Sequence, residues 1–344
     1  MTNQLITWYK KNKRDLPWRN TSDPYKIWVS EIIMQQTQIK TGTKYYIKFI
    51  DKFPGIDSLA MASELEVLHT WQGLGYYSRA LNMLNAAKTI KNNFSGIFPS
   101  SYNELITLKG VGIYTASAIS SICQNEKRAV VDGNVYRVLS RFYNIATPIN
   151  TNDGKKLFQN IANTLIHDSI PGIYNQAIMD FGAIHCKKNN PKCNTCPLKI
   201  NCAALKLNLI NYRPVKKPPK KIRTRYFNYL LIKFDGCIVI QQRDKNDIWK
   251  KLYELPLIES KEMIDKKHII THNYLDKFKI YKIQNNGRKK HMLSHQKLVM
   301  SFWEIIIKEW PKKQIYKKIK LTEISNYPFP KPLKEYLNKE DKIH

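Results

Sequence analysis

The segment CKKNNPKCNTCPLKINC, residues 186–202, carries four of the six cysteines of the chain. These four are Cys186, Cys193, Cys196 and Cys202. Four thiolates in one short loop suit a tetrahedral zinc ion or an iron–sulfur cluster, because both accept four sulfur ligands. The other two cysteines, Cys123 and Cys237, lie in apolar runs, where a small buried side chain is expected. The segment therefore predicts a metal site.

A pair of disulfides is the alternative reading of these four cysteines. It is disfavoured because nothing at the N-terminus indicates export, and cytosolic thiols stay reduced. The first residues, MTNQLITWYKKNKRDLPW, have charges on both sides of a short apolar patch and no signal-peptide core. No stretch approaches the roughly 20 apolar residues of a membrane span. We expect a cytoplasmic protein with no membrane partner.

The composition favours a nucleic-acid partner. The chain has 344 residues, enough for two domains, and a hydrophobic fraction of 43% excludes wholesale disorder. Lys and Arg number 57 against 27 Asp and Glu, a net charge of +30 that raises affinity for polyanions. Lys, Ile and Asn are abundant throughout, as in proteins from AT-rich genomes, so genome composition supplies part of the surplus. The charge supports a nucleic-acid partner without proving one.

Residues 1–205 have the periodicity of helices. Apolar residues recur three and four positions apart, for example in WVSEIIMQQ and IYTASAISSI. Residues 206–225 form a basic linker, whose segment RPVKKPPKKIRTR contains seven basic residues, three prolines and no acid. We expect this linker to be extended and to lie along phosphate.

In residues 226–344 the period changes to two. The runs YFNYLLIKF and CIVIQQR flank an Asp235–Gly236 turn, which indicates a β-hairpin. Further strand-like runs are KFKIYKI and KLVMSFWEIII. The predicted fold class is multidomain, with an all-helical first domain and a smaller α+β second domain.

The segment LKGVG, residues 108–112, lies between two helical patterns. Gly110 and Gly112 permit a tight turn that a β-carbon would hinder. The following helix then starts with free N–H groups that can seat a phosphate. Plain packing of a helical hairpin is the alternative, and the cysteine segment further along favours DNA binding.

The helix–hairpin–helix, the acidic Asp132 and the spacing Cys-x6-Cys-x2-Cys-x5-Cys together resemble the endonuclease III superfamily of DNA base-excision glycosylases. Within it, the chain most closely resembles the MutY family of adenine DNA glycosylases. The matching runs are LPWR (16–19), SEIIMQQTQ (30–38), GLGYYSRA (73–80), VDGNVYRVL (131–139) and NQAIMDFGA (175–183). The resemblance implies a [4Fe–4S] cluster on the four cysteines, double-stranded DNA as partner, a monomer, and a DNA-associated place in a bacterial cytoplasm.

Glu31 is the candidate general acid. Asp23 and Pro24 are typical of a helix start, and apolar neighbours such as Trp28 and Ile32 surround Glu31. Lost hydration favours the neutral carboxyl that a general acid needs. A surface glutamate on an amphipathic helix is the alternative. The resemblance implies that Glu31 protonates adenine N7, so that the base leaves neutral, and afterwards helps to activate the water.

The resemblance assigns three more residues to catalysis. Asp132 would stay ionised and stabilise the oxocarbenium-like sugar, a division of roles that glycosidases also use. Asn134 would hold the acidic pair by hydrogen bonds, and Asp132 is also a candidate cap of the next helix. Bifunctional relatives have a lysine at the position of Tyr114, and its amine forms a Schiff base with the sugar. A tyrosine cannot, so we expect a monofunctional enzyme that leaves an intact abasic site.

Adenine has to leave the duplex to reach such an enzyme. By the resemblance, the residues that line or contact the base pocket are Trp18, Arg19, Tyr114 and Asp180. The residues expected to contact the DNA around it are Gln35, Gln36, Tyr76, Gly110 and Gly112. Ordinary core packing is the alternative for Trp18 and Tyr76. Some relatives carry glutamate at position 180, so the shorter aspartate makes a base contact harder to reach.

The second domain resembles the Nudix-like C-terminal domain that recognises 8-oxoguanine opposite the adenine. It has no REXXEE-type acidic box, so nucleotide hydrolysis is not expected. The run HMLSHQKL (291–298) aligns with the family's F-S-H loop and makes Ser294 and His295 candidate lesion-recognising residues. A polar turn before a strand is the alternative, and Leu293 stands where phenylalanine is usual.

The chain departs from the family pattern at two further turns, where glycine or proline is usual. In IWKKLYELP (248–256), Lys250 and Lys251 replace two glycines of the family pattern. Lys109 replaces the proline usual in the hairpin, which costs rigidity and adds a cation close to phosphate, so we expect DNA binding to survive.

The function expected from the sequence is a monofunctional adenine DNA glycosylase in base excision repair, acting on adenine opposite 8-oxoguanine or guanine. One alternative is an endonuclease III-like glycosylase for oxidised pyrimidines, which Tyr114 and the second domain disfavour. The other is a non-catalytic DNA-damage-binding protein, which the presence of both Glu31 and Asp132 disfavours.

Overall fold

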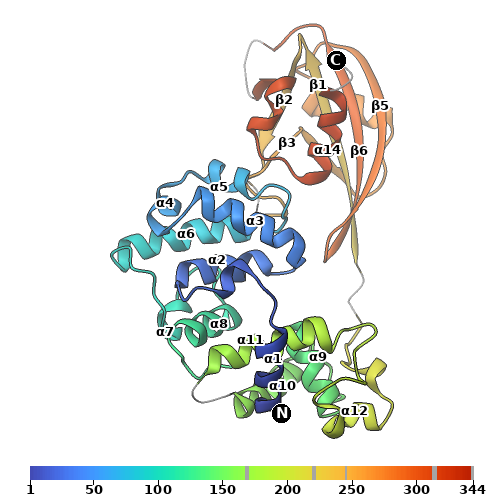
Figure 1. The fold of residues 1–344 in the computed structure, drawn as a ribbon. Helices are drawn as coiled ribbons and strands as arrows, with labels where there is room; N and C mark the ends of the chain where they lie inside the picture. The colour runs from blue at the N-terminus through green and yellow to red at the C-terminus, as the bar shows by residue number, and fades with distance from the viewer. Residues whose placement is uncertain (167–169, 219–221, 245, 312–315, 342–344) are drawn as a thin grey trace. The chain divides into compact units, whose positions relative to one another are not determined.

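The chain divides into two units, of which residues 1–62 and 82–218 form the first and residues 63–81 and 219–344 the second (Figure 1). The computed structural model describes residues 1–166, 170–218, 222–244, 246–311 and 316–341.

Residues 1–218 form helices, and the described part of this range contains no strand, as the 3.6-residue periodicity predicts. The longer helices are α1 (Thr2–Asn12), α2 (Pro24–Met34), α3 (Ile39–Lys52), α4 (Ile56–Met61), α5 (Glu64–Thr70), α6 (Ser78–Asn93), α8 (Ile113–Cys123), α9 (Gly133–Phe142), α10 (Asn152–Leu165) and α11 (Pro171–Asp180). The short ones are η1 (Pro17–Arg19), α7 (Tyr102–Leu105), the π-helical turn η2 (Phe181–His185), η3 (Lys199–Asn201), α12 (Ala203–Lys206) and η4 (Ile210–Tyr212).

The start of α2 follows the predicted capping pattern. The Asp23 carboxylate accepts hydrogen bonds from the backbone N–H groups of Tyr25 and Lys26, and Pro24 is the first helical residue. The cap satisfies N–H groups that have no partner inside the helix. It fixes where α2 begins, and therefore which way Glu31 points two turns later.

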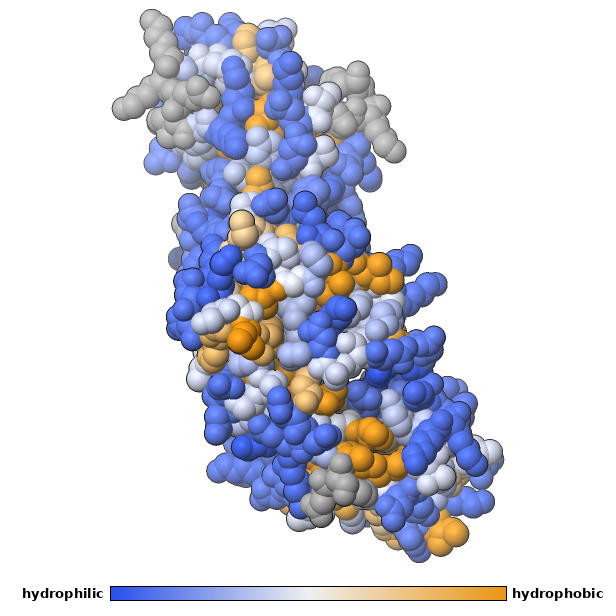
Figure 2. All heavy atoms as spheres, turned by 60° about the vertical axis from the view of Figure 1, so that its left-hand side comes forward, coloured by the Kyte–Doolittle hydropathy of each residue, from blue (hydrophilic) through white to orange (hydrophobic). Residues whose placement is uncertain are grey.

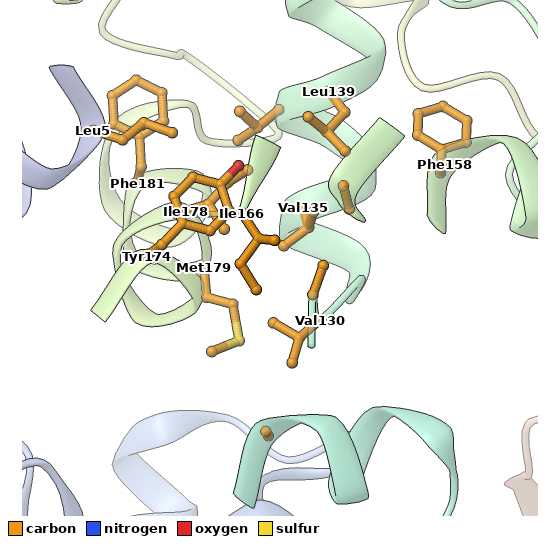
Figure 3. Packing of buried hydrophobic residues seen from close by; sticks show 14 of the residues in the cluster. Leu5, Val130, Val135, Leu139, Phe158, Ile166, Tyr174, Ile178, Met179 and Phe181 are labelled. Atoms are coloured by element: carbon orange, nitrogen blue, oxygen red, sulfur yellow. The ribbon is translucent and has the colours of Figure 1, made fainter. Parts of the chain in front are cut away.

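Helix α11 lies at the centre of the helical core (Figure 3). Its residues Tyr174 and Ile178 are buried and pack with Val135 and Leu139 of α9. Leu5 of α1 belongs to the same cluster. Tyr114, Cys186 and Cys196 pack against this core from its margin, so the core supports both the acidic residues and the cysteine loop.

The second unit contains a seven-stranded sheet in the order β3-β2-β1-β6-β5, with β4 also paired to β1 and β7 to β2. The strands are β1 (Arg223–Phe234), β2 (Cys237–Gln242), β3 (Tyr253–Glu254), β4 (Leu257–Ser260), β5 (Ile280–Met292), β6 (Gln296–Ile307) and β7 (Lys317–Lys320). Strands β1 and β6 are parallel and the other pairs are antiparallel. The predicted Asp235–Gly236 hairpin is confirmed, because Phe234 pairs with Cys237 across that turn.

Each face of the sheet has its own helical cover. On one face, α14 (Lys331–Asp341) contributes Leu333 and Leu337 to a core with Phe227 and Met300. The short helix η6 (Leu321–Asn326) adds Leu321 and Ile324 to this core. On the other face, α13 (Lys266–Ile270) and η5 (Asn273–Leu275) border the sheet, and Ile269 and Leu275 pack with Trp303 and Ile305. The predicted fold class, an all-helical domain followed by an α+β domain, is confirmed.

The linker is tied to the first unit at its beginning. The Ile149 N–H donates to the Val215 carbonyl at 3.0 Å, and Asn150 exchanges hydrogen bonds with the backbone of Lys217. Residues 219–221 of the predicted linker lie outside the described residues. The predicted extended conformation is wrong for residues 206–212, which form the end of α12, a turn and η4. Residues 213–218 have no regular secondary structure and are bound to the first unit.

Hydrophilic side chains cover most of the face seen in Figure 2, with small apolar patches between them. None of the described helices combines the length and the apolar character that a membrane crossing requires.

Candidate active site

Glu31 lies on α2 among side chains that exclude water. Ile27, Trp28 and Ile32 are almost fully buried around it, whereas Glu31 itself is only partly buried and can be reached from solvent. Burial raises the pKa of the Glu31 carboxyl, and a hydrogen bond with Tyr114 and the charge of Arg19 oppose that rise. The nearby Asp132 charge raises the pKa further. Glu31 therefore keeps its proton to a higher pH than an ordinary glutamate.

Tyr114 stands in the first turn of α8, directly after the glycine hairpin. Burial raises its pKa well above the ordinary value, and the charges of Glu31 and Asp132 add to this effect. The phenol therefore stays neutral, and its hydroxyl also donates to the Met179 sulfur at 3.3 Å. The structure thus brings Tyr114 together with both carboxyl groups that the sequence singled out.

Asp132 caps α9, as its position in the sequence predicts. Its carboxylate accepts from the backbone N–H groups of Asn134 at 2.9 Å and Val135 at 2.8 Å, and from the Asn134 side-chain amide at 2.7 Å. Burial raises the pKa of Asp132, while these hydrogen bonds and the charge of Arg137 lower it. The two backbone N–H groups hold Oδ1 and the Asn134 amide holds Oδ2, so the carboxylate is fixed in place.

Arg137 is a supporting residue that sequence reasoning missed. Its guanidinium donates to the Asn134 side-chain oxygen and to the carbonyl oxygens of Gly182 and Cys186. Gly182 fits so closely that an added Cβ would come within 2.6 Å of the Asn134 Cβ. The sequence signal for Arg137 was its position three residues after Asn134, on the same face of α9.

Asp180 is fully buried at the end of α11 and binds two arginines. Its Oδ1 accepts from Arg14 Nη2 at 2.6 Å and from Arg19 Nη2 at 2.8 Å, and its Oδ2 accepts from the Arg14 backbone N–H. The carboxylate that was expected to contact the base is therefore occupied by Arg14 and Arg19. Arg14 was missed, although it precedes the matched LPWR run by two residues.

Arg19 is held by hydrogen bonds to Asp180 and Tyr9. It donates to the Tyr9 hydroxyl at 3.1 Å, and that hydroxyl donates to Gln176. Its Nε is buried and has no hydrogen-bond partner among the described residues. Since the Arg19 charge acts on both Glu31 and Tyr114, it belongs to the same site.

The two glycines of the hairpin have different roles. Gly110 has a φ of +83°, and an added Cβ would lie 2.7 Å from the Asn82 Cβ. Gly112 is the cap residue of α8 with an extended backbone, and an added Cβ would meet nothing within 4 Å. The predicted tight turn thus depends on Gly110, and the exposed Lys109 beside it forms no ion pair within the described residues.

The remaining first-unit candidates lie at the end of α2 and in η1. Gln35 ends α2 and donates to the Thr115 hydroxyl at 3.5 Å, while the exposed Gln36 has a φ of +56°. Trp18 is buried and packs edge-on against Tyr46. Left-handed backbone at a residue other than glycine is a common sign of a functional position.

In the second unit the structure brings Tyr76 and Ser294 together. The two hydroxyl groups form a hydrogen bond, although 218 positions separate them. Tyr76 is 45% exposed and has a φ of +50°, and His295 beside Ser294 is exposed. The two sequence candidates from distant runs therefore meet at one surface.

The cysteine loop is built around Arg141, a fully buried arginine of α9. Its guanidinium donates to the sulfur of Cys186 at 3.5 Å and to the carbonyl oxygens of Lys187 and Lys188, and its own carbonyl accepts from Cys202. It also donates to two carbonyls at the start of the linker, those of Ile210 and Arg213.

The four thiols of the loop lie near one another. Burial raises the pKa of the Cys196 thiol to about 11, and the charges of Cys186, Cys202 and Cys193 contribute to the rise. Among the described residues, no three or more His, Cys, Asp or Glu side chains are arranged to hold a metal ion. Four cysteine thiolates are nevertheless the donor set that an iron–sulfur cluster takes.

The geometry divides the chemical tasks between two carboxyl groups. One, Glu31, has few hydrogen bonds and a raised pKa, which suits proton donation. The other, Asp132, accepts three hydrogen bonds that favour its charged form, which suits the stabilisation of a nearby cation. Enzymes that break glycosidic bonds commonly use such a pair of carboxyl groups.

Comparison with protein families finds two matches. Residues 29–163 match the HhH-GPD superfamily of base excision DNA repair proteins, and residues 228–339 match the NUDIX domain. The first match contains Glu31, Tyr114 and Asp132.

Individual relatives agree with these families. The chain is 40% identical to the adenine DNA glycosylase of Buchnera aphidicola subsp. Baizongia pistaciae, over 88% of this chain and 86% of that protein. A thermostable thymine-DNA glycosylase of known structure is 29% identical, with a TM-score of 0.56 over 60% of this chain and 95% of its own. An endonuclease III–DNA complex has a TM-score of 0.53 at 21% identity, over 60% of this chain and 94% of that one, and shares the fold.

Proposed function

The chain belongs to the adenine DNA glycosylases of the HhH-GPD superfamily, and from this membership we propose that it removes adenine mispaired with 8-oxoguanine or guanine in duplex DNA. The observation that carries the proposal is the meeting of Glu31, Tyr114 and Asp132 in one partly buried site. Burial raises the pKa of both carboxyl groups there, but only Asp132 has a set of hydrogen bonds that favours its charge.

The reaction starts with proton transfer from Glu31 to N7 of the extruded adenine. The bond between C1′ and N9 breaks, its electron pair stays with the base, and neutral adenine leaves. The ionised Asp132 stabilises the positive charge left on the sugar. Water then adds to C1′ and gives its proton to Glu31, which restores the acid. The products are adenine and an intact abasic site.

The enzyme is monofunctional in this proposal because the site offers no amine to the sugar. Tyr114 occupies the position of the Schiff-base lysine of bifunctional relatives, and its buried neutral phenol cannot form that adduct. Its hydrogen bond to Glu31 orients the acid instead.

Asp180 acts as a positioning residue rather than as a base contact. Its oxygens are occupied by Arg14 and Arg19, so it fixes the Arg19 side chain beside Glu31. In this proposal the Arg19 side chain moves before its buried, unpartnered Nε donates to the extruded base, and the neighbouring Trp18 is buried.

In this proposal the second unit recognises 8-oxoguanine through Ser294 and His295. Tyr76 of the second unit and Gln35 of the first act as wedges, and Gln36 follows Gln35 in the chain. The hydrogen bond between Tyr76 and Ser294 supports a joint role of the two loops.

The four cysteines would hold a [4Fe–4S] cluster, which supplies a covalent staple for the loop when bound. The chain's own contribution is to fold residues 186–202 around Arg141 and to present basic side chains to DNA phosphate. These side chains are Lys187, Lys188, Lys192 and Lys199.

One assay tests the function. The protein is incubated with a labelled duplex carrying adenine opposite 8-oxoguanine, and strand cleavage is compared with and without alkali. We expect cleavage at the adenine only after alkali. Direct nicking at an oxidised pyrimidine would favour the endonuclease III-like alternative, and lesion binding without any product would favour the non-catalytic one.

A further inference from the structure

We propose that one end of the sheet, formed by Tyr226, Arg288, Lys290, Met292 and Lys297, is an additional surface that binds the phosphate backbone of duplex DNA. We call these five residues the basic sheet end. The proposal rests on the proposed function, because it deepens DNA recognition by the second unit. The sequence predicted strands at Tyr226 and Lys297, placed Met292 in the run that resembles the F-S-H loop, and assigned no role to Arg288 and Lys290.

A β-bulge decides which side chains of β5 face this surface. Asn285 pairs with Trp303 and Arg288 pairs with Ser301, so three steps along β5 oppose two steps along β6. Gly287 lies in this bulge with a φ of +104°, and its N–H binds the Asn285 side chain. A bulge of one residue inverts the alternation of the strand beyond it. Without the bulge, Gly287 and Lys289 would lie on the same face of the sheet as Asn285. With the bulge, Arg288 and Lys290 lie on that face instead.

The strand register assembles the basic sheet end across three strands. Lys290 pairs with Val299, and Val299 pairs with Tyr226 of β1. Met292 pairs with Lys297 two residues further along each strand. Directly paired residues point to the same face of a sheet. The side chains of Tyr226, Lys290, Met292 and Lys297 thus form two adjacent rows.

Burial agrees with this division of faces. Along β5, Arg288, Lys290 and Met292 are exposed, with Met292 58% exposed, whereas the alternating Lys289 and His291 are partly buried. Lys289 forms an ion pair with Glu335 of α14 on the opposite face. The helices α13 and η5 pack on the same face as the basic sheet end. They lie around Ile283 and Trp303, which are further along β5 and β6 from it.

The positive charge of the basic sheet end favours a polyanion as its ligand. Three of the five residues are cations and none is acidic. Within the described chain, neither Arg288 nor Lys290 forms an ion pair, whereas Lys289 between them does. Surface cations left without a carboxylate, next to an aromatic and a methionine, fit a sugar–phosphate backbone.

The chain places this surface next to the candidate lesion loop. Met292 is the last residue of β5, and Ser294 follows it by two positions before β6 begins at Gln296. A duplex held by Ser294 and His295 therefore passes within reach of the rows that flank the loop. β5 is also an edge strand, paired only with β6, so no further strand covers it among the described residues.

The test uses the full chain with the double substitution Arg288→Gln and Lys290→Gln. The matched control is Lys289→Gln, which removes the same kind of charge from the opposite face of the same strand. Affinity for a duplex with an abasic-site analogue opposite 8-oxoguanine is measured as a function of salt concentration. Adenine excision at saturating enzyme is measured in parallel.

We expect the double variant to lower the slope of log affinity against log salt by about 2, since each phosphate contact contributes about 0.9. Affinity at low salt should fall about tenfold, and excision at saturating enzyme should stay within about twofold of the parent. Lys289→Gln should leave the slope unchanged.

An unchanged slope in the double variant, with normal excision by the parent, overturns this proposal alone. Absence of excision by the parent protein overturns the proposed function instead. If the double variant loses binding to polyglutamate but keeps its DNA affinity, the surface belongs to an acidic protein partner and the proposal is wrong.

Discussion

At the scale of single residues, the proposed role of Glu31 as general acid predicts how excision depends on pH. The carboxyl must be protonated to act, and burial raises its pKa, so activity should persist to higher pH than for an ordinary glutamate and fall as pH rises through that pKa. Asp132 must be ionised, and burial raises its pKa too, so activity should also fall on the acid side. We expect a bell-shaped profile of single-turnover excision against pH.

Glu31→Gln should remove the alkaline limb of this profile. It should slow excision by about 10²-fold to 10⁴-fold, the usual contribution of a general acid, and retain binding of the lesion duplex. Glu64→Gln, at an exposed position of α5, serves as control and should keep the parent rate and profile. Retained excision in Glu31→Gln would mean that the acid is a different residue.

Asp180 contributes to the stability of the fold and holds the Arg19 side chain in position. Asp180→Asn leaves Arg14 and Arg19 without their buried anion, which should lower the free energy of unfolding by about 3 kcal/mol. Excision should fall as well, because Arg19 loses its anchor. Asp51→Asn, an exposed aspartate on α3, should change the free energy of unfolding by less than about 0.5 kcal/mol. Urea denaturation compares the two, and equal midpoints would contradict the ion-pair argument.

At the scale of structural elements, the glycine hairpin depends on one glycine more than the other. Gly110→Ala forces a Cβ into left-handed backbone against Asn82 and should cost about 1–2 kcal/mol of stability, with weaker DNA binding. Gly112→Ala has extended backbone and open space, so its cost should stay below about 1 kcal/mol. Thermal denaturation and duplex titration of both variants test this ranking, which similar losses would refute.

The sequence predicted most elements because their signals are local. The Asp23 cap, the Asp235–Gly236 turn and the 3.6-residue and two-residue periods need only neighbouring residues. The bulge at Gly287 was not predictable from the run IYKIQNNGRKKHM, because it depends on how β6 pairs with it. A strand register is a property of two segments, and one segment alone does not determine it.

The same contrast applies to the site. The resemblance to a known family singled out Glu31, Tyr114 and Asp132, and the fold brings them together. The resemblance did not point to Arg14, Arg137 and Arg141. These residues act through buried carboxylates and carbonyl oxygens contributed by distant segments. The same kind of long-range contact showed that Asp180 is occupied by arginines.

At the scale of the whole molecule, the cysteine loop connects the helical core to the linker. Cys193→Ala should abolish the visible absorbance expected of an iron–sulfur chromophore, lower the melting temperature and weaken DNA binding. Cys123→Ala, at the end of α8 and outside the loop, should retain the absorbance. An unchanged spectrum in Cys193→Ala would refute the assignment of the ligands, and loss in both variants would refute the distinction between them.

The π-helical turn Phe181–His185 has a consequence for how this family can vary. It joins Asp180, which holds Arg19, to Cys186, the first cysteine of the loop, so one short spacer serves two sites. A π-turn is equivalent to one residue inserted into an α-helix. Deleting that residue would rewind the segment and swing Cys186 by about 100° around the helix axis relative to Asp180, given 3.6 residues per turn. The length of this spacer is therefore under constraint from both ends, and at Gly182 an added side chain would in addition meet Asn134.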